Sequence, residues 1–242
     1  MLDLTKDIID WIKYYFEDNP DGKVICGISG GKDSTIVAAL CVEALGKDRV
    51  IGVLMSNGIQ DDINDSYTVC NYLGIEVIHV NIRQAYLSLT EQISWSTNKP
   101  VLPDSISTNL PSRLRMCTLY SIAALYPNSR VVNTSNYSER YIGYSTKFGD
   151  GAGDFSPLGN FTVREVLMIG DDLGLPYELV HKTPSDGMSG KSDEEKIGFT
   201  YEELDDYISS NHPNISDEVA AKIEHLFRIN RHKLVDMPRY PD

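Results

Sequence analysis

The sequence predicts an α/β protein, with a doubly wound, mainly parallel sheet flanked by helices. Apolar runs of strand length at 23–28, 49–55 and 75–80 alternate with helical patterns, which is β-α-β-α-β spacing. Serine, asparagine and glycine residues follow the first two runs, as is common after strands at the ligand-binding edge of such sheets. The 242 residues suffice for one large domain, so we expect a single domain over 1–242 with right-handed crossovers.

The elements of the first half follow from their periodicity. Leu4, Ile8, Ile12 and Tyr15 recur at helical spacing, and Asn-Pro-Asp-Gly at 19–22 ends that helix with turn residues. The three predicted strands are separated by patterns that indicate helices at 35–45, 65–73 and 82–93.

The middle of the chain predicts a loop, a helix and a fourth strand. Residues 94–108 are rich in Ser, Thr, Asn and Pro without an apolar period, so we expect a mobile loop that acts as a lid. A helix follows at 109–126, with Pro111 tolerated only near its first turn, and Arg130–Thr134 has the pattern of a strand.

Two segments of the second half are poor in apolar side chains. Residues 135–154 combine polar residues and glycines, which favours a functional site over a solvated loop, and residues 184–196 predict a second mobile segment. Helical patterns occupy 161–173, 201–208 and 216–228.

Composition limits the partners and the compartment. Asp and Glu number 35 against 22 Lys and Arg, a net charge of −13, which disfavours nucleic acid as a partner. The four cysteines are dispersed, without a zinc pattern, and are typical of a reducing compartment. The N-terminal sequence indicates neither a signal peptide nor a membrane span, so we expect a cytoplasmic protein without membrane contact.

The turn between the first strand and its helix has the residues of a phosphate site. It reads Ser-Gly-Gly-Lys-Asp-Ser over 29–34. The two glycines leave backbone N–H groups open to an anion, and the helix N-terminus adds further donors. The serines add hydroxyls, Lys32 adds charge, and Asp33 can hold a divalent cation on the phosphates. The alternative is an ordinary glycine-rich turn with a helix cap.

This loop resembles the SGGxDS pyrophosphate loop of the adenine nucleotide alpha-hydrolase-like superfamily, and fits neither the Walker nor the dinucleotide pattern. Over nearly its whole length the chain resembles ammonia-dependent NAD synthetases. The similarity lies in residues 29–34, in Asn-Gly-Ile-Gln-Asp-Asp at 57–62, in Asn-Leu-Pro-Ser-Arg-Leu-Arg-Met at 109–116, in 143–154, in Lys-Ser-Asp-Glu at 191–194, and in His232-Lys233.

The resemblance implies a ligase that activates the carboxylate of deamido-NAD with ATP. Pyrophosphate leaves, and ammonia displaces AMP to give NAD. It also implies Mg²⁺ as the metal, ATP as co-substrate and a homodimer. Because no length remains for an amidase domain, we expect free ammonia or a separate donor of ammonia.

The residue roles that the resemblance implies fall into four groups. ATP contacts are implied for Ser29, Gly30, Gly31, Lys32, Asp33, Ser34, Thr134 and Ser185. Deamido-NAD contacts are implied for Asn109, Arg113, Lys147, Asp154, Glu194, His232 and Lys233. The metal ligands implied are Asp33 and Glu139. Catalytic roles are implied for Asp33, Lys147 and Asp150, with Asp150 near the ammonia site.

Two cations of the family pattern are missing. Leu54 stands where many members have an Arg aimed at ATP, and Val163 stands where they have a Lys. Lys32, Arg164 or Lys182 are the candidates to compensate. Glu139 also admits a plain alternative, an exposed ion pair with Arg140 or Lys147.

Three other readings remain open at this point. One is a tRNA-modifying enzyme with the same loop, against which the acidic composition argues. Another is a GMP-amidating enzyme, which would lack the 143–154 block. The third is a nucleotide-binding sensor without chemistry, against which the three acids Asp33, Glu139 and Asp150 argue.

Overall fold

A four-stranded parallel sheet forms the centre of the computed structural model, which describes all residues except 61, 182–192, 210–214 and 241–242. The strand order is β3-β2-β1-β4. The strands are β1 (Val24–Gly27), β2 (Val50–Leu54), β3 (Glu76–His79) and β4 (Arg130–Val132). All three pairings are parallel, which confirms the predicted fold class.

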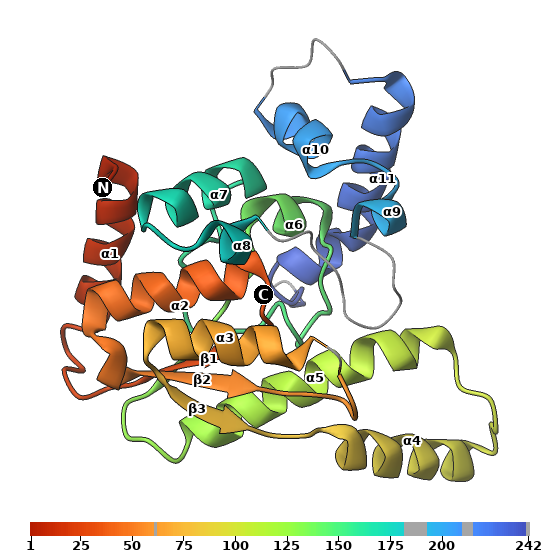
Figure 1. Ribbon diagram of the computed structural model, residues 1–242. Helices are drawn as coiled ribbons and strands as arrows, with labels where there is room; N and C mark the ends of the chain where they lie inside the picture. The colour runs from red at the N-terminus through yellow and green to blue at the C-terminus, as the bar shows by residue number, and fades with distance from the viewer. Residues whose placement is uncertain (61, 182–192, 210–214, 241–242) are drawn as a thin grey trace.

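Helices cover both faces of the sheet (Figure 1). Alternate strand residues point to opposite faces, so Val24 and Cys26 join one apolar cluster and Ile25 joins another. The first face is covered by α1 (Asp3–Tyr15), α2 (Lys32–Leu45), α3 (Ile63–Leu73), α7 (Val163–Asp172) and α8 (Tyr177–Val180). The second is covered by α5 (Asp104–Ala123), against which α4 (Arg83–Thr97) packs. A single 3₁₀ turn, Lys47–Arg49, leads into β2.

A third apolar cluster lies away from the sheet and joins the C-terminal helices to the rest. It is built by α6 (Tyr137–Ile142), α7, α10 (Tyr201–Ile208) and α11 (Asp217–Leu234), and α9 (Asp193–Ile197) packs beside it. The buried carboxylate of Asp205 in α10 accepts hydrogen bonds from Ser138 Oγ and, at 2.9 Å, from Arg164 N. This cluster fixes α10 next to α6.

The predicted loop at 94–108 is wrong for most of its length. Helix α4 runs on to Thr97, and α5 begins at Asp104, so the connection spans only 98–103. The hydroxyls that suggested a loop are satisfied within the helices, since Thr97 Oγ1 donates to Ile93 O (2.7 Å) and Thr108 Oγ1 donates to Asp104 O (3.1 Å). Pro111 is correspondingly an interior residue of α5 and not a first-turn residue.

The second segment predicted to be mobile, 184–196, lies mostly outside the described residues. Its last four residues belong to α9. In the part of the chain that the structure describes, no helix is long and apolar enough to cross a membrane.

Candidate active site

The glycine loop connects β1 to α2 at the carboxyl edge of the sheet, as predicted. Gly30 has φ of 79°, and a Cβ there would lie 2.8 Å from the Cβ of Asp65, so only glycine fits this close approach to α3. Ser29 and Ser34 hydroxyls lie 3.1 Å apart, and Gly31 N donates to Ser29 Oγ at 3.2 Å. The loop is therefore shaped by its own hydroxyls before any anion binds.

Lys32 and Asp33 form a buried ion pair at the start of α2. Lys32 Nζ lies 2.8 Å from Asp33 Oδ2, and the Lys32 side chain is 6% exposed. Burial alone would lower the pKa of Lys32, but the charges of Asp33 and Glu139 outweigh it and raise that pKa. The ammonium group thus stays charged and is directed at the two acids predicted to bind metal.

Glu139 in α6 meets this pair from across the site. Burial, and then the charge of Asp33, raise the pKa of Glu139 to about 8, although Lys32 acts in the opposite direction. The alternative, an exposed ion pair of Glu139 with Arg140 or Lys147, is wrong. In the structure Arg140 donates to Gly159 O and Lys147 donates to His232 O. The two predicted metal ligands, far apart in sequence, are therefore neighbours.

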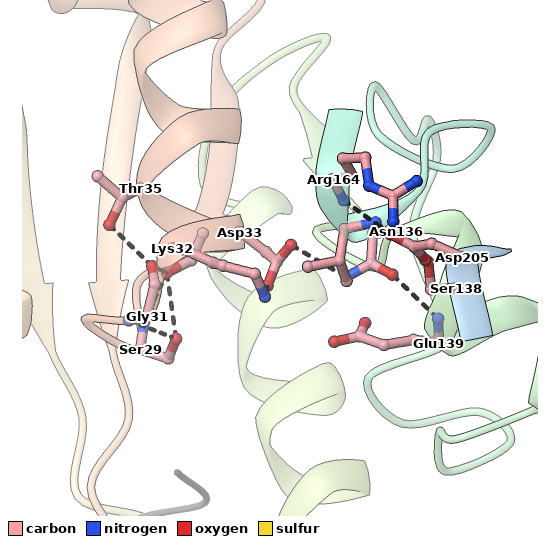
Figure 2. Close-up of polar contacts among 12 residues, drawn as sticks. Ser29, Gly31, Lys32, Asp33, Thr35, Asn136, Ser138, Glu139, Arg164 and Asp205 are labelled. Carbon is pink, nitrogen blue, oxygen red and sulfur yellow. Dashed lines mark hydrogen bonds and ion pairs between the residues drawn. The ribbon is translucent and has the colours of Figure 1, made fainter. Parts of the chain in front are cut away.

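Asn136 ties the two acids together, and the sequence analysis missed it. Its fully buried side chain donates through Nδ2 to Asp33 Oδ1 (3.1 Å) and accepts through Oδ1 from Glu139 N (2.9 Å). Figure 2 shows Asn136 between Asp33 and Glu139. An Asn three residues before a Glu is a helix N-cap pattern, and that signal could have marked it.

The donor set of this acid pair fits magnesium. Asp33 and Glu139 offer hard carboxylate oxygens, and Mg²⁺ in proteins commonly takes one or two carboxylates, with water and substrate phosphates as its other ligands. Burial is the largest cause of the raised pKa of Glu139, and the charge of Asp33 adds to it, against the opposing effect of Lys32. A divalent cation at this position would remove that repulsion.

The 143–154 segment folds against α5 and holds Asp150. Asp150 Oδ1 accepts from Ser112 Oγ at 2.7 Å and from Thr146 N at 2.8 Å. Asn109 Oδ1 accepts from Thr146 Oγ1 at 2.8 Å, and Arg113 Nε donates to Lys147 O at 3.3 Å. The segment thus brings Asp150, predicted to be catalytic, close to Asn109 and Arg113, predicted to contact deamido-NAD.

The C-terminal end of α11 holds the same segment from the other side. Lys233 Nζ donates to Gly143 O and Ser145 O, each at 2.9 Å. Lys147 Nζ donates to His232 O at 2.5 Å, so both lysines are engaged with backbone carbonyls. His232 itself contacts Ile229 O through Nδ1 at 3.0 Å.

A hollow of about 370 Å³ opens beside these residues. Its lining includes Arg140, Lys147 and Lys233, with Asn133 and Phe148. Three cationic side chains around one hollow suit an anionic ligand, even though the whole chain is acidic.

Two more predicted residues, Asp154 and Glu194, have structural contacts. Asp154 accepts from Val131 N at 2.7 Å and from Tyr120 OH at 3.2 Å, which anchors the end of the 143–154 segment to β4. Glu194 Oε1 accepts from Tyr201 N at 2.8 Å. Thr134 lies two residues after the end of β4, and Ser185 lies outside the described residues.

The positions where two cations were expected are apolar for a packing reason. Leu54 is fully buried in the cluster that α1 and α2 form with the sheet, and Val163 belongs to the C-terminal cluster. Arg164 pairs with Asp206 at 2.8 Å on the surface, away from Asp33. Lys182 lies outside the described residues, so Lys32 is the compensating candidate that the described residues place at the acids.

Comparison with known proteins agrees with the sequence resemblance. The family model described as NAD synthase matches residues 4–237. The chain is 36% identical over 242 residues to the NH(3)-dependent NAD(+) synthetase of Alkaliphilus metalliredigens, covering 97% of this chain and 96% of that one. It is 34% identical over 235 residues to the enzyme of the same name from Pyrococcus furiosus, covering 90% and 88%.

Solved structures similar to this chain include one protein named for NMN and one named for NAD. NMN synthetase from Francisella tularensis superposes with a TM-score of 0.87 and 30% identity, covering 99% of this chain and 97% of that one. The NH3-dependent NAD synthetase from Campylobacter jejuni, in complex with the nitrate ion, gives 0.80 and 28%, covering 99% and 98%.

Proposed function

The chain belongs to the NAD synthase family, and we propose that it amidates deamido-NAD with ammonia in an ATP-dependent reaction that gives NAD, AMP and pyrophosphate. The observation that carries the proposal is the convergence of the Ser29–Ser34 loop with Asp33 and Glu139 at one edge of the sheet. The names of relatives that match nearly the whole chain supply the reaction.

The first half-reaction uses the loop and its lysine. The substrate carboxylate attacks the α-phosphorus of ATP, a C–O–P link forms, and the bond to the β-phosphate breaks with release of pyrophosphate. The backbone N–H groups at the start of α2 and the ammonium of Lys32 would hold the departing charge. Positioning and charge neutralisation suffice for this step.

Magnesium would be held by Asp33 and Glu139, and when bound it neutralises phosphate charge. Asn136 links the Asp33 carboxylate to the backbone of Glu139 and so holds the two residues next to each other. Lys32 balances part of their charge without a metal.

The second half-reaction needs a neutral amine near the adenylate. Asp150 lies within electrostatic reach of Glu139, and it either binds ammonium or accepts its proton. Ammonia then attacks the carbonyl carbon, the amide C–N bond forms, and AMP leaves with the C–O electrons. Ser112 and Thr146 N fix the position of the Asp150 carboxylate.

The nucleotide substrate would occupy the cationic hollow. Lys147, Lys233 and the neighbouring Arg140 offer positive charge to its phosphates. Asn109, Arg113, Asp154, Glu194 and His232 would contribute mainly by holding the surrounding backbone.

Nicotinate mononucleotide is a second candidate substrate. It is favoured by the high structural similarity to the Francisella protein, whose name gives NMN as the product. The test incubates purified protein with ATP, MgCl₂ and ammonium, together with either deamido-NAD or nicotinate mononucleotide. The products NAD, NMN, AMP and ADP are then quantified. We expect NAD and AMP in equal amounts; ADP as product would contradict the mechanism, and NMN formed in preference to NAD would assign the mononucleotide.

We also propose a homodimer. Helix α4 buries no residue and exposes Leu87, Leu89 and Trp95, the last at 80%. A helix with three exposed apolar side chains favours a protein contact. Analytical ultracentrifugation should give a dimer for the wild type and a weaker dimer for Trp95→Glu; a wild-type monomer at micromolar concentration would contradict the proposal.

The compartment proposed is the cytoplasm. All four cysteines are free, and Cys26, Cys41 and Cys70 are buried, as is usual for proteins in a reducing environment. The net charge of −13 supports small-molecule partners over nucleic acid.

A further inference from the structure

The hydroxyl of Tyr201 is buried without a hydrogen-bond partner. Tyr201 is the first residue of α10 and is 5% exposed. Its phenolic oxygen is buried and has no partner within the part of the chain that the structure describes. Buried polar groups are almost always paired, so an unpaired one next to a candidate active site is a candidate for a ligand contact.

The Tyr201 ring is fixed in this position by contacts on both sides of its helix. Tyr201 N donates to Glu194 Oε1 at 2.8 Å, and the preceding Thr200 forms a capping box with Glu203. One turn further on, Asp205 is bonded to α6 and α7. The ring itself packs in the C-terminal apolar cluster. The hydroxyl is therefore held in place.

The surroundings of the hydroxyl are those of the phosphate and metal site. Lys32 Nζ lies 5.8 Å from the centre of the Tyr201 ring, within range of a cation–π contact. Burial, and then the charges of Glu139, Asp193 and Asp33, raise the pKa of Tyr201 well above its usual value. The phenol thus keeps its proton and is available as a donor, and none of the described residues accepts a hydrogen bond from it.

An anionic oxygen is the ligand atom that this donor would take. Asp33 already accepts from Lys32 and Asn136, and Asp193 accepts from Tyr144 OH at 3.1 Å. A polyphosphate chain bound to the Ser29–Ser34 loop would lie at the start of α2, where the Lys32 ammonium reaches the Tyr201 ring.

We propose that the Tyr201 hydroxyl donates a hydrogen bond to a phosphate oxygen of ATP bound at the glycine loop, and so acts as a phosphate-binding residue. The inference rests on the proposed function in one respect, that the loop binds ATP. It adds a contact from α10, a helix to which the resemblance assigned no site residue.

The competing explanation is that Tyr201 serves only as an apolar ring in the C-terminal cluster. The two explanations differ in a measurable way. Removing a buried hydroxyl that has no partner leaves the ligand-free protein as stable as before or more stable, since no hydrogen bond is lost and an unsatisfied group disappears. Only a ligand contact makes the same change weaken nucleotide binding.

The test compares Tyr201→Phe with wild type by isothermal titration with ATP and MgCl₂, without ammonium or a nicotinate substrate. We expect ATP affinity to fall roughly ten- to a hundredfold, the range for a hydrogen bond to a charged group. The melting temperature of the ligand-free variant should equal or exceed that of wild type. Unchanged ATP affinity, or a lower melting temperature without ligand, would overturn the proposal.

Tyr207→Phe is the matched control on the same helix. Tyr207 OH donates to Glu224 Oε1 at 3.1 Å, away from the glycine loop, so its loss should leave ATP affinity unchanged. A weakening equal to that of Tyr201→Phe would show a general effect on α10 and contradict the assignment. If wild type makes NAD and AMP but Tyr201→Phe binds ATP normally, this inference alone fails; if wild type does not bind ATP, the proposed function fails.

Discussion

Replacing Glu139 with Gln should remove a pH dependence from the stability of the metal-free protein. The pKa of Glu139 is raised from an ordinary 4.5 to about 8 in the folded chain, first by burial and then by Asp33. The folded state therefore binds more protons than the unfolded state between these two values. The contribution of Glu139 to the free energy of unfolding is therefore greatest below pH 4.5 and is lost as pH rises through 8.

The magnitude follows from the same two values. Their separation corresponds to about 4.8 kcal/mol at 1.36 kcal/mol per pH unit, which is a ceiling. Glu139 is only partly shielded from solvent, so we expect about 2 kcal/mol. Glu139→Gln should thus be more stable than wild type by about this amount at pH 8.5 and nearly equal to it at pH 5.

Urea unfolding with EDTA present, at pH 5 and at pH 8.5, measures the difference. Glu43→Gln, which removes one exposed charge within α2, controls for the change in net charge. A wild type and a Glu139→Gln variant whose stabilities change in parallel with pH would refute the assignment of Glu139 to a shielded acid pair.

Three further substitutions test the frame of the site. Asn136→Ala removes a helix cap and the bond to Asp33, so unfolding should become easier by about 1–3 kcal/mol and ATP turnover should require more MgCl₂; an unchanged magnesium requirement would argue against a positioning role. Gly30→Ala forces a side chain into a left-handed conformation against Asp65 and should cost about 2–3 kcal/mol of stability with a loss of ATP binding; normal binding by calorimetry would disprove the close approach. Lys233→Met removes both bonds to the 143–145 backbone, and steady-state kinetics should show KM for the nicotinate substrate raised about tenfold with a smaller change in kcat; a change confined to kcat would contradict this.

Local sequence patterns predicted the sheet and its glycine loop well. In this part of the chain, apolar runs alternate with short polar segments. The pattern covers the strand at 23–28, the loop and the following helix, and the neighbouring elements repeat it. The topology then follows from parallel crossovers. The adjacency of Asp33 and Glu139 came only from the family resemblance, since no local pattern joins residues on different elements.

The errors and omissions of the sequence analysis have physical causes. The connection before α5 was overestimated because Ser and Thr hydroxyls bonded to backbone carbonyls resemble loop residues in composition. Asn136 and Tyr201 were missed because their importance lies in what they touch across the fold. For Lys147 and Lys233 the charge was noticed, but their present partners are carbonyls of the chain itself.

The packing of Leu54 limits which side chains this position can accept. A fully buried leucine between the sheet and its helices leaves no space for a guanidinium group, and burying that charge unpaired would cost several kcal/mol. A single Leu54→Arg substitution would therefore destabilise the fold unless the surrounding core changed with it. The positive charge of the nucleotide site therefore has to come from Lys32 and its neighbours, and substitutions that change this charge have to occur there.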